Sequence, residues 1–77
     1  MKKVKIYSTQ SCGFCVRVKQ YLTDNSIEFE NVDITVEPDK AQEMVEKSGQ
    51  MGVPVLDIEG EIIVGFDKEK IDQALGI

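Results

Sequence analysis

The order in which strand-like and helix-like patterns follow one another constrains the fold of this chain more than any other feature. Residues 3–8 and 27–34 alternate apolar and polar side chains, as strands with one better-buried face do. Between them, residues 12–25 repeat apolar side chains every three or four positions, as an amphipathic helix does. Two strands joined by a crossover helix are expected to run parallel.

The second half of the chain continues with a helix, a two-strand hairpin and a last helix, over residues 38–48, 55–58, 61–64 and 68–75. Pro38 suits the first position of a helix, Gly49 suits its end, and Asp67 suits the N-cap of the last helix. Glu59-Gly60 is a two-residue hairpin signal, so the third and fourth strands are expected to be antiparallel neighbours. The predicted order is β-α-β-α-β-β-α, which is an α/β fold.

The length of 77 residues allows one small core, and we expect a single domain over residues 1–77. No segment approaches the roughly 20 consecutive apolar residues of a membrane helix, and the first residues lead into a strand pattern without a secretion signal. These features predict a cytoplasmic protein that does not bind membranes. The net charge of −5 argues against nucleic-acid binding as the main activity.

Charge is distributed unevenly along the chain. Residues 1–26 carry five basic residues and one acidic residue, for a net charge of +4, so the remainder must carry −9. The basic third could steer an anionic substrate or partner surface toward itself. A solvated face with incidental clustering explains the same distribution.

The chain has two cysteines, Cys12 and Cys15, at the predicted junction of the first strand and the first helix. A structural disulfide across so short a loop would contribute only about 2 kcal/mol, and the expected compartment is reducing. A zinc site normally requires four ligands, and the sequence has no histidine and no second cysteine pair. Two inert buried cysteines would leave their position at a helix start unexplained.

A redox-active pair accounts for both the position and the spacing. Residues three apart lie on one face of a helix, so Cys12 and Cys15 can form a disulfide and separate again with little backbone change. The unpaired N–H groups and the positive dipole of the helix N-terminus favour a thiolate at Cys12. Cys15 lies one turn further in and should be less exposed. We therefore predict that Cys12 attacks and later leaves, while Cys15 resolves the mixed disulfide.

Three blocks of sequence together resemble the glutaredoxin family. They are Cys12 to Cys15, Val53-Pro54 before the hairpin, and Gly65-Phe66-Asp67 before the last helix, in the family's order and spacing. The resemblance covers essentially the whole chain. It implies a thioredoxin fold, in which a four-stranded mixed sheet of strand order 2-1-3-4 is flanked by three helices. It also implies a thiol–disulfide oxidoreductase that reduces protein disulfides or glutathione mixed disulfides without a bound cofactor.

The resemblance also assigns binding roles. The Val53-Pro54 bond is implied to be cis and to lie beside the cysteines, with the Val53 backbone pairing with substrate; a trans proline at a strand start is the plainer alternative. The backbone at Gly65 and the side chain of Asp67 are implied to hold the γ-glutamyl end of glutathione. Both residues also suit a strand end and a helix cap. Phe14 and Phe66 complete the implied substrate-binding set.

Several positions depart from the pattern of glutathione-using members. Gly13-Phe14 replaces the common Pro-Tyr, Thr9 replaces a common lysine, and Gly52 replaces the threonine of Thr-Val-Pro. Gly65-Phe66 instead resembles NrdH-redoxins, which take electrons from thioredoxin reductase and reduce ribonucleotide reductase. The electron donor is therefore glutathione or thioredoxin reductase, with disulfide-containing or glutathionylated proteins as substrates.

Two further functions belong to other classes. Some glutaredoxins carry an iron–sulfur cluster between two chains, held by the first active-site cysteine and glutathione, and an absorbance band after anaerobic reconstitution would support that role. A non-catalytic binding module would retain its partner affinity in the Cys12→Ser variant. An oxidoreductase acting as a monomer remains the leading prediction.

Overall fold

The computed structural model describes residues 3–76. Along the chain lie β1 (Val4–Ser8), α1 (Gly13–Asp24), β2 (Glu30–Asp33), α2 (Pro38–Ser48), β3 (Val55–Ile58), β4 (Glu61–Val64) and α3 (Lys68–Leu75). This is the predicted order of elements. The described residues do not include Met1, Lys2 or Ile77. All three belong to the expected domain, and the first two belong to its basic N-terminal third.

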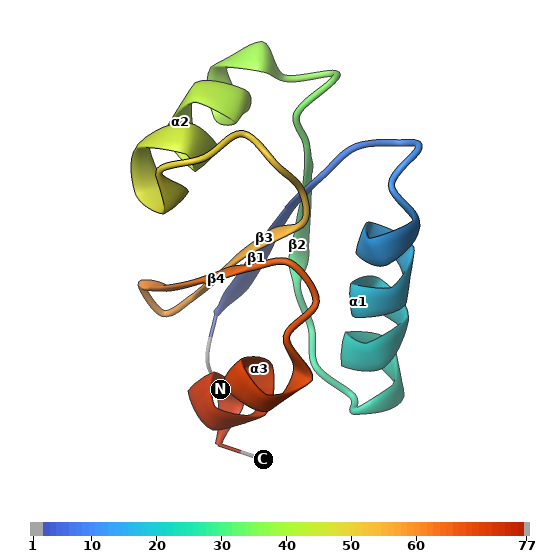
Figure 1. Cartoon of the computed structure of the whole chain (residues 1–77). Coiled ribbons are helices and arrows are strands. Elements are labelled where there is room, and N and C mark those ends of the chain that lie inside the picture. The colour runs from blue at the N-terminus through green and yellow to red at the C-terminus, as the bar shows by residue number, and fades with distance from the viewer. Residues whose placement is uncertain (1–2, 77) are drawn as a thin grey trace.

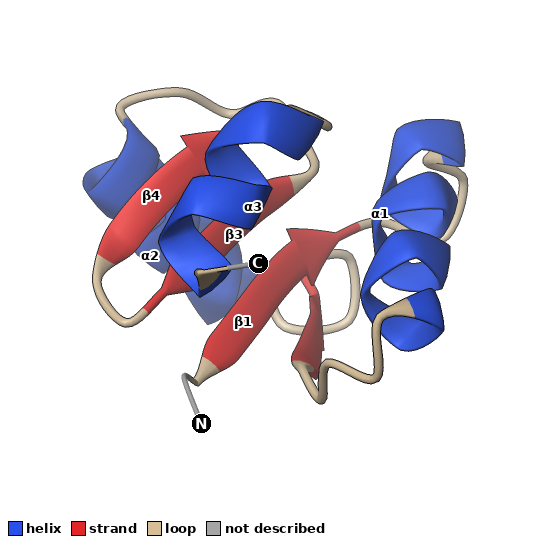
Figure 2. Cartoon of the chain, turned by 90° about the horizontal axis from the view of Figure 1, so that it is seen from below, coloured by secondary structure: helices blue, strands red, loops and turns tan. Residues whose placement is uncertain are grey.

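The four strands form one mixed sheet in the order β2-β1-β3-β4, as the glutaredoxin resemblance implies. β1 is parallel to β2 and antiparallel to β3, and β3 is antiparallel to β4. Helices α1 and α3 cover one face of the sheet and α2 covers the other; α3 and α2 lie in front of and behind the sheet in Figure 2. Figure 1 shows α1 and α3 together, apart from α2.

Each face of the sheet has its own apolar core. The α1/α3 side buries nine side chains: Val4, Ile6, Val18, Leu22, Leu56, Ile58, Ile63, Ile71 and Ala74. The α2 side buries Tyr7, Val32, Met44 and Val55. Two cores in a small chain follow from a central sheet with helices on both faces.

Helix ends follow the local sequence. Pro38 is the first residue of α2, and Gly49 ends it at φ 76°. Asp67 caps α3 by accepting a hydrogen bond from the Lys70 backbone N–H at 3.2 Å, and Gly76 ends that helix at φ 76°. These predictions are confirmed, because capping depends on residues within one turn of the end.

Two predictions about strands are wrong in part. The second strand was expected over residues 27–34 but pairs with β1 only over Glu30–Asp33. The Ile27 N–H instead bonds to the Leu22 carbonyl at 2.8 Å, at the end of α1. Ile27 and Phe29 alternate with polar residues because they pack on the α1/α3 core, outside the strand.

In the first strand, the alternation of Val4 and Ile6 with Lys3, Lys5 and Tyr7 predicts one better-buried face, with Tyr7 on the less buried one. Tyr7 is fully buried. The strand lies between β2 and β3, and α2 covers its second face.

Among residues 3–76, no helix is long and apolar enough to cross a membrane.

Candidate active site

Both cysteines lie at the start of α1. Cys12 is the N-cap, with extended backbone (φ −96°, ψ 110°), and Gly13 is the first helical residue. The Sγ of Cys12 accepts a hydrogen bond from the Cys15 backbone N–H at 3.1 Å. This satisfies one of the donors that a helix leaves unpaired at its N-terminus, as the sequence predicts.

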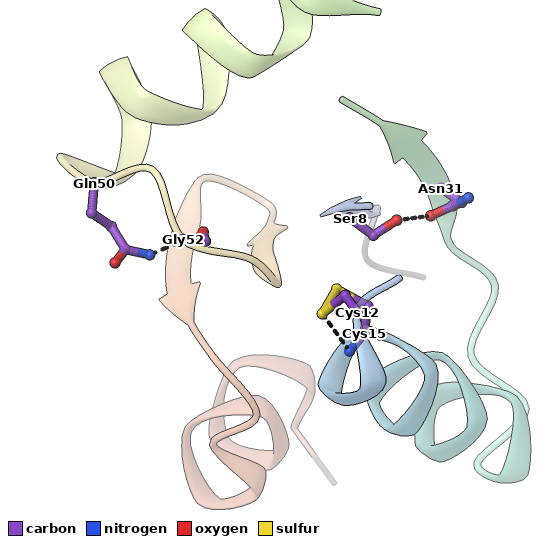
Figure 3. The surroundings of a disulfide bond; sticks show 6 residues. All are labelled: Ser8, Cys12, Cys15, Asn31, Gln50 and Gly52. Carbon is purple, nitrogen blue, oxygen red and sulfur yellow. Dashed lines mark hydrogen bonds between the residues drawn. A yellow bond between two sulfur atoms is a disulfide. The ribbon is translucent and has the colours of Figure 1, made fainter. Parts of the chain in front are cut away.

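The two cysteines are joined in a disulfide, with their Cα atoms 5.2 Å apart (Figure 3). Cys15 is fully buried, whereas Cys12 is partly exposed. The structure therefore presents an asymmetric pair in which an incoming sulfur can reach Cys12 more easily. Among the described residues, no group of three or more His, Cys, Asp or Glu side chains is placed to hold a metal ion.

Two hydrogen-bonded pairs surround the disulfide in Figure 3. The Ser8 hydroxyl, which is buried at the end of β1, donates to Asn31 Oδ1 at 2.7 Å. In the loop before Pro54, the Gln50 side-chain amide donates to the Gly52 carbonyl at 3.2 Å. Gly52 stands where the family commonly has threonine, and a Cβ there would meet the Gln50 side chain at 3.3 Å. The Gln50 side chain therefore occupies space beside this glycine.

A groove of about 530 Å³ brings together all six residues that the resemblance implies for substrate binding. Its lining is Phe14, Val53, Pro54, Val64, Gly65, Phe66, Asp67 and Lys68. The Val53–Pro54 peptide bond is cis, as implied. The Gly65 N–H donates to the Pro54 carbonyl at 2.8 Å, which ties the start of β3 to the end of β4.

Val64 and Lys68 line the groove and were not predicted. Val64 is predicted only as part of the hairpin, yet the residue is 48% exposed. Lys68 directly follows the cap residue Asp67 and is 65% exposed at its side chain. The sequence signal that could have identified them as groove residues is that each directly adjoins a residue implied to bind substrate, Gly65 or Asp67.

Charges and aromatic rings meet at the groove. Phe14 is 59% exposed, and the Arg17 guanidinium lies 5.6 Å from its ring centroid. The Asp67 carboxylate is engaged as the helix cap, and the Lys68 ammonium pairs with Asp72 at 2.9 Å. Hydrogen bonding to Asp72 raises the pKa of Lys68 above its ordinary value, so this ammonium stays protonated.

This groove is not the largest hollow on the molecule. One of about 820 Å³ lies at the opposite end of β1, lined in part by Lys3, Phe29, Gly60 and Leu75. No cysteine lines it. The smaller groove is the better candidate because one of its lining residues, Phe14, lies between Cys12 and Cys15 in sequence.

Comparison with known proteins agrees with this geometry. The glutaredoxin family model matches residues 4–63. The chain belongs to the glutaredoxin family. An uncharacterized glutaredoxin-like 8.6 kDa protein of the rubredoxin operon of Clostridium pasteurianum is 43% identical over 72 residues, which are 94% of this chain and 96% of that protein. Glutaredoxin 3 of Escherichia coli K12 is 33% identical over 67 residues, covering 87% of this chain and 81% of that protein.

Solved structures show the same fold for this glutaredoxin-family chain. The crystal structure of a mutant of a thioredoxin-like protein superposes with a TM-score of 0.91 at 31% identity, covering 100% of this chain and 99% of that one. Both lines of comparison extend over nearly the full length of the chain. They establish a glutaredoxin-like redox protein with a Cys12–Cys15 pair.

Proposed function

We propose that this chain is a dithiol thiol–disulfide oxidoreductase that reduces protein disulfides and glutathione mixed disulfides. The observation that carries the proposal is the inequality of the two sulfurs. The Cys12 sulfur is partly exposed and accepts a backbone N–H at the helix N-terminus, while Cys15 is fully buried one turn further in. Such an arrangement stabilises a thiolate on one sulfur and keeps the other in reserve.

The reaction begins with the reduced pair. The Cys12 thiolate attacks one sulfur of the substrate disulfide, forms a mixed disulfide and expels the other sulfur as a thiolate. Cys15 then loses its proton to solvent and attacks the Cys12 sulfur, forming the Cys12–Cys15 disulfide and expelling the second substrate thiol. Two electrons pass from the protein to the substrate, and an external thiol donor returns them.

The groove supplies the binding. Val53 and Pro54 form one wall, where the Val53 backbone pairs with an extended substrate. Gly65 and Asp67 lie in the segment that leads into α3, where a helix N-terminus suits a carboxylate. The cap role of Asp67 is compatible with this function, because the cap uses one carboxylate oxygen and leaves the other for an amino group.

A second electron donor is favoured by one observation. Phe66 lines the groove at a position where glutathione-using members commonly have glycine, and Gly-Phe is typical of NrdH-redoxins. In this alternative, thioredoxin reductase replaces glutathione as donor and ribonucleotide reductase is the acceptor. The chemistry at Cys12 and Cys15 is the same.

The test supplies purified protein with a glutathionylated peptide and NADPH, coupled either to glutathione and its reductase or to thioredoxin reductase. We expect turnover with at least one system, and turnover with only one identifies the donor. Cys12→Ser should abolish turnover in both. Cys15→Ser should retain activity with glutathione, which can resolve the mixed disulfide itself, and lose activity with thioredoxin reductase. Turnover that survives Cys12→Ser, or none with the native pair, would refute the proposal.

A further inference from the structure

An aromatic residue of α1, Tyr21, contacts the segment that forms the groove wall at the start of α3. Tyr21 lies on α1, is partly buried and does not line the groove. It is nine residues beyond Cys12, which is about 13 Å along a helix. Any influence of Tyr21 on a substrate bound at Cys12 must therefore act through other residues.

Three contacts connect Tyr21 to the segment that begins α3. Its hydroxyl donates to the Asp72 carboxylate. Its ring lies under the Lys68 ammonium, 5.4 Å from the centroid, and Lys68 also pairs with Asp72 at 2.9 Å. Its ring meets the Phe66 ring at a centroid distance of 5.9 Å and an interplanar angle of 53°.

Two of these three partners line the groove. Phe66 and Lys68 form its wall on either side of the cap residue Asp67. The contacts are of the kinds that fix geometry: tilted ring pairs, a cation over a ring, and a charge-assisted hydrogen bond. Removal of Tyr21 would leave Phe66 without its aromatic neighbour and Lys68 without the ring beneath it.

We propose that Tyr21 is a positioning residue that holds Phe66 and Lys68 against the groove and so determines how well the chain selects substrates with groups beyond the reacting sulfurs. This inference rests on the proposed function, since it concerns the selectivity of the same disulfide exchange. Sulfur exchange itself does not involve Tyr21. The effect should therefore appear with a substrate that fills the groove and be absent with one that does not.

The chain contains a matched control. Tyr7 makes two of the same three kinds of contact elsewhere: its hydroxyl donates to Glu43, and the Lys47 ammonium lies 5.7 Å from its ring centroid. Tyr7 faces α2 and does not line the groove. Tyr7→Phe thus removes an equivalent hydroxyl without touching the α3 wall.

The experiment mixes the reduced protein with glutathione disulfide, whose peptide arms extend over the groove, or with 2-hydroxyethyl disulfide, which has none. Single-turnover loss of free thiol gives a rate constant for each. We expect Tyr21→Leu to lower the glutathione disulfide rate constant about 5- to 10-fold and the other less than about 2-fold. Tyr21→Phe should lower the first about 2- to 3-fold, and Tyr7→Phe should change neither.

The route of the effect is tested in a Phe66→Gly background, where Tyr21→Leu should cause a smaller loss than in the native protein, because only the contact with Lys68 remains to be removed. The inference would be overturned if Tyr21→Leu slowed the reactions with both disulfides by the same factor. It would also be overturned if Tyr7→Phe lost as much selectivity between the two disulfides as Tyr21→Phe does.

A readout that needs no turnover separates this inference from the proposed function. In oxidised protein, the backbone amide resonances of residues 65–68 should shift in Tyr21→Leu and stay in place in Tyr7→Phe. If the native protein reacts with neither disulfide faster than free cysteine, the proposed function fails, while these resonances still decide the positioning role. Resonances of residues 65–68 that do not respond to Tyr21→Leu would refute it.

Discussion

The two cysteines of the reduced protein should differ widely in their rate of alkylation. The perturbation is a pair of single variants, Cys15→Ser and Cys12→Ser, each of which leaves one thiol. The structure indicates two separate causes for a difference. Cys12 is partly exposed and its sulfur accepts the N–H of residue 15, while the Cys15 side chain is fully buried.

Burial sets the magnitude for Cys15. A reagent reaches it only after the first turn of α1 opens, which breaks backbone hydrogen bonds worth about 0.5–1.5 kcal/mol each and exposes apolar surface. An opening free energy of about 2–3 kcal/mol corresponds to a population of open molecules of roughly 1 in 30 to 1 in 150. Alkylation of Cys15 should be slower than that of a free cysteine peptide by about that factor.

The hydrogen bond acts on Cys12 mainly through pH dependence. An ordinary cysteine is only about 3% thiolate at pH 7, and a stabilised thiolate is also a weaker nucleophile, with a Brønsted slope of about 0.4–0.5. The two effects partly cancel at neutral pH. The hydrogen bond should be detected more clearly in the pH dependence: the alkylation rate of Cys12 should reach its plateau at a lower pH than the alkylation rate of a cysteine peptide.

The assay is iodoacetamide alkylation from pH 5 to pH 9, followed by mass spectrometry, with an unstructured peptide of residues 9–18 as the reference. Circular dichroism confirms that both variants are folded. If both thiols react at the rate of the peptide and with its pH dependence, the unequal pair does not exist and the proposed mechanism is refuted.

Three other predictions concern stability and binding. Leu22→Ala deletes a fully buried side chain and should lower the free energy of unfolding by about 2–5 kcal/mol. Phe14→Ala, at a 59% exposed position, should lower it by less than about 0.5 kcal/mol and instead raise KM for the glutathionylated peptide. Urea unfolding measures the first effect and steady-state kinetics the second. Asp67→Asn keeps the helix cap, so thermal unfolding should change little while affinity for glutathione falls; Asp67→Ala should also cost about 1 kcal/mol. A hydrogen bond from Tyr7 lowers the pKa of the Glu43 carboxyl in the folded state. The ionised carboxylate therefore stabilises the fold at pH values above its unfolded pKa, and this contribution is lost as the pH falls through the lower folded pKa. Tyr7→Phe should flatten the acid side of the profile of melting temperature against pH, and an unchanged profile would contradict this origin.

The sequence alone predicted the order of the elements and the position of the cysteine pair at the start of a helix. Capping, hairpin and periodicity signals depend on residues only a few positions apart, so the ends of α2 at Gly49 and of α3 at Asp67 could be predicted from local rules. The same local logic placed Cys12 at a helix N-terminus. The cis bond at Pro54 came from resemblance to the family, because no local rule favours it over trans.

The tertiary structure decided which side chains are covered and which meet. Tyr7 looked half-exposed by alternation, yet α2 packs on it from more than 30 residues away. The groove gathers Phe14, Val53 and Phe66 from three segments, and Tyr21 reaches Asp72 across 51 positions. Periodicity reports the face on which a residue lies but not what packs against that face, because burial depends on distant parts of the chain.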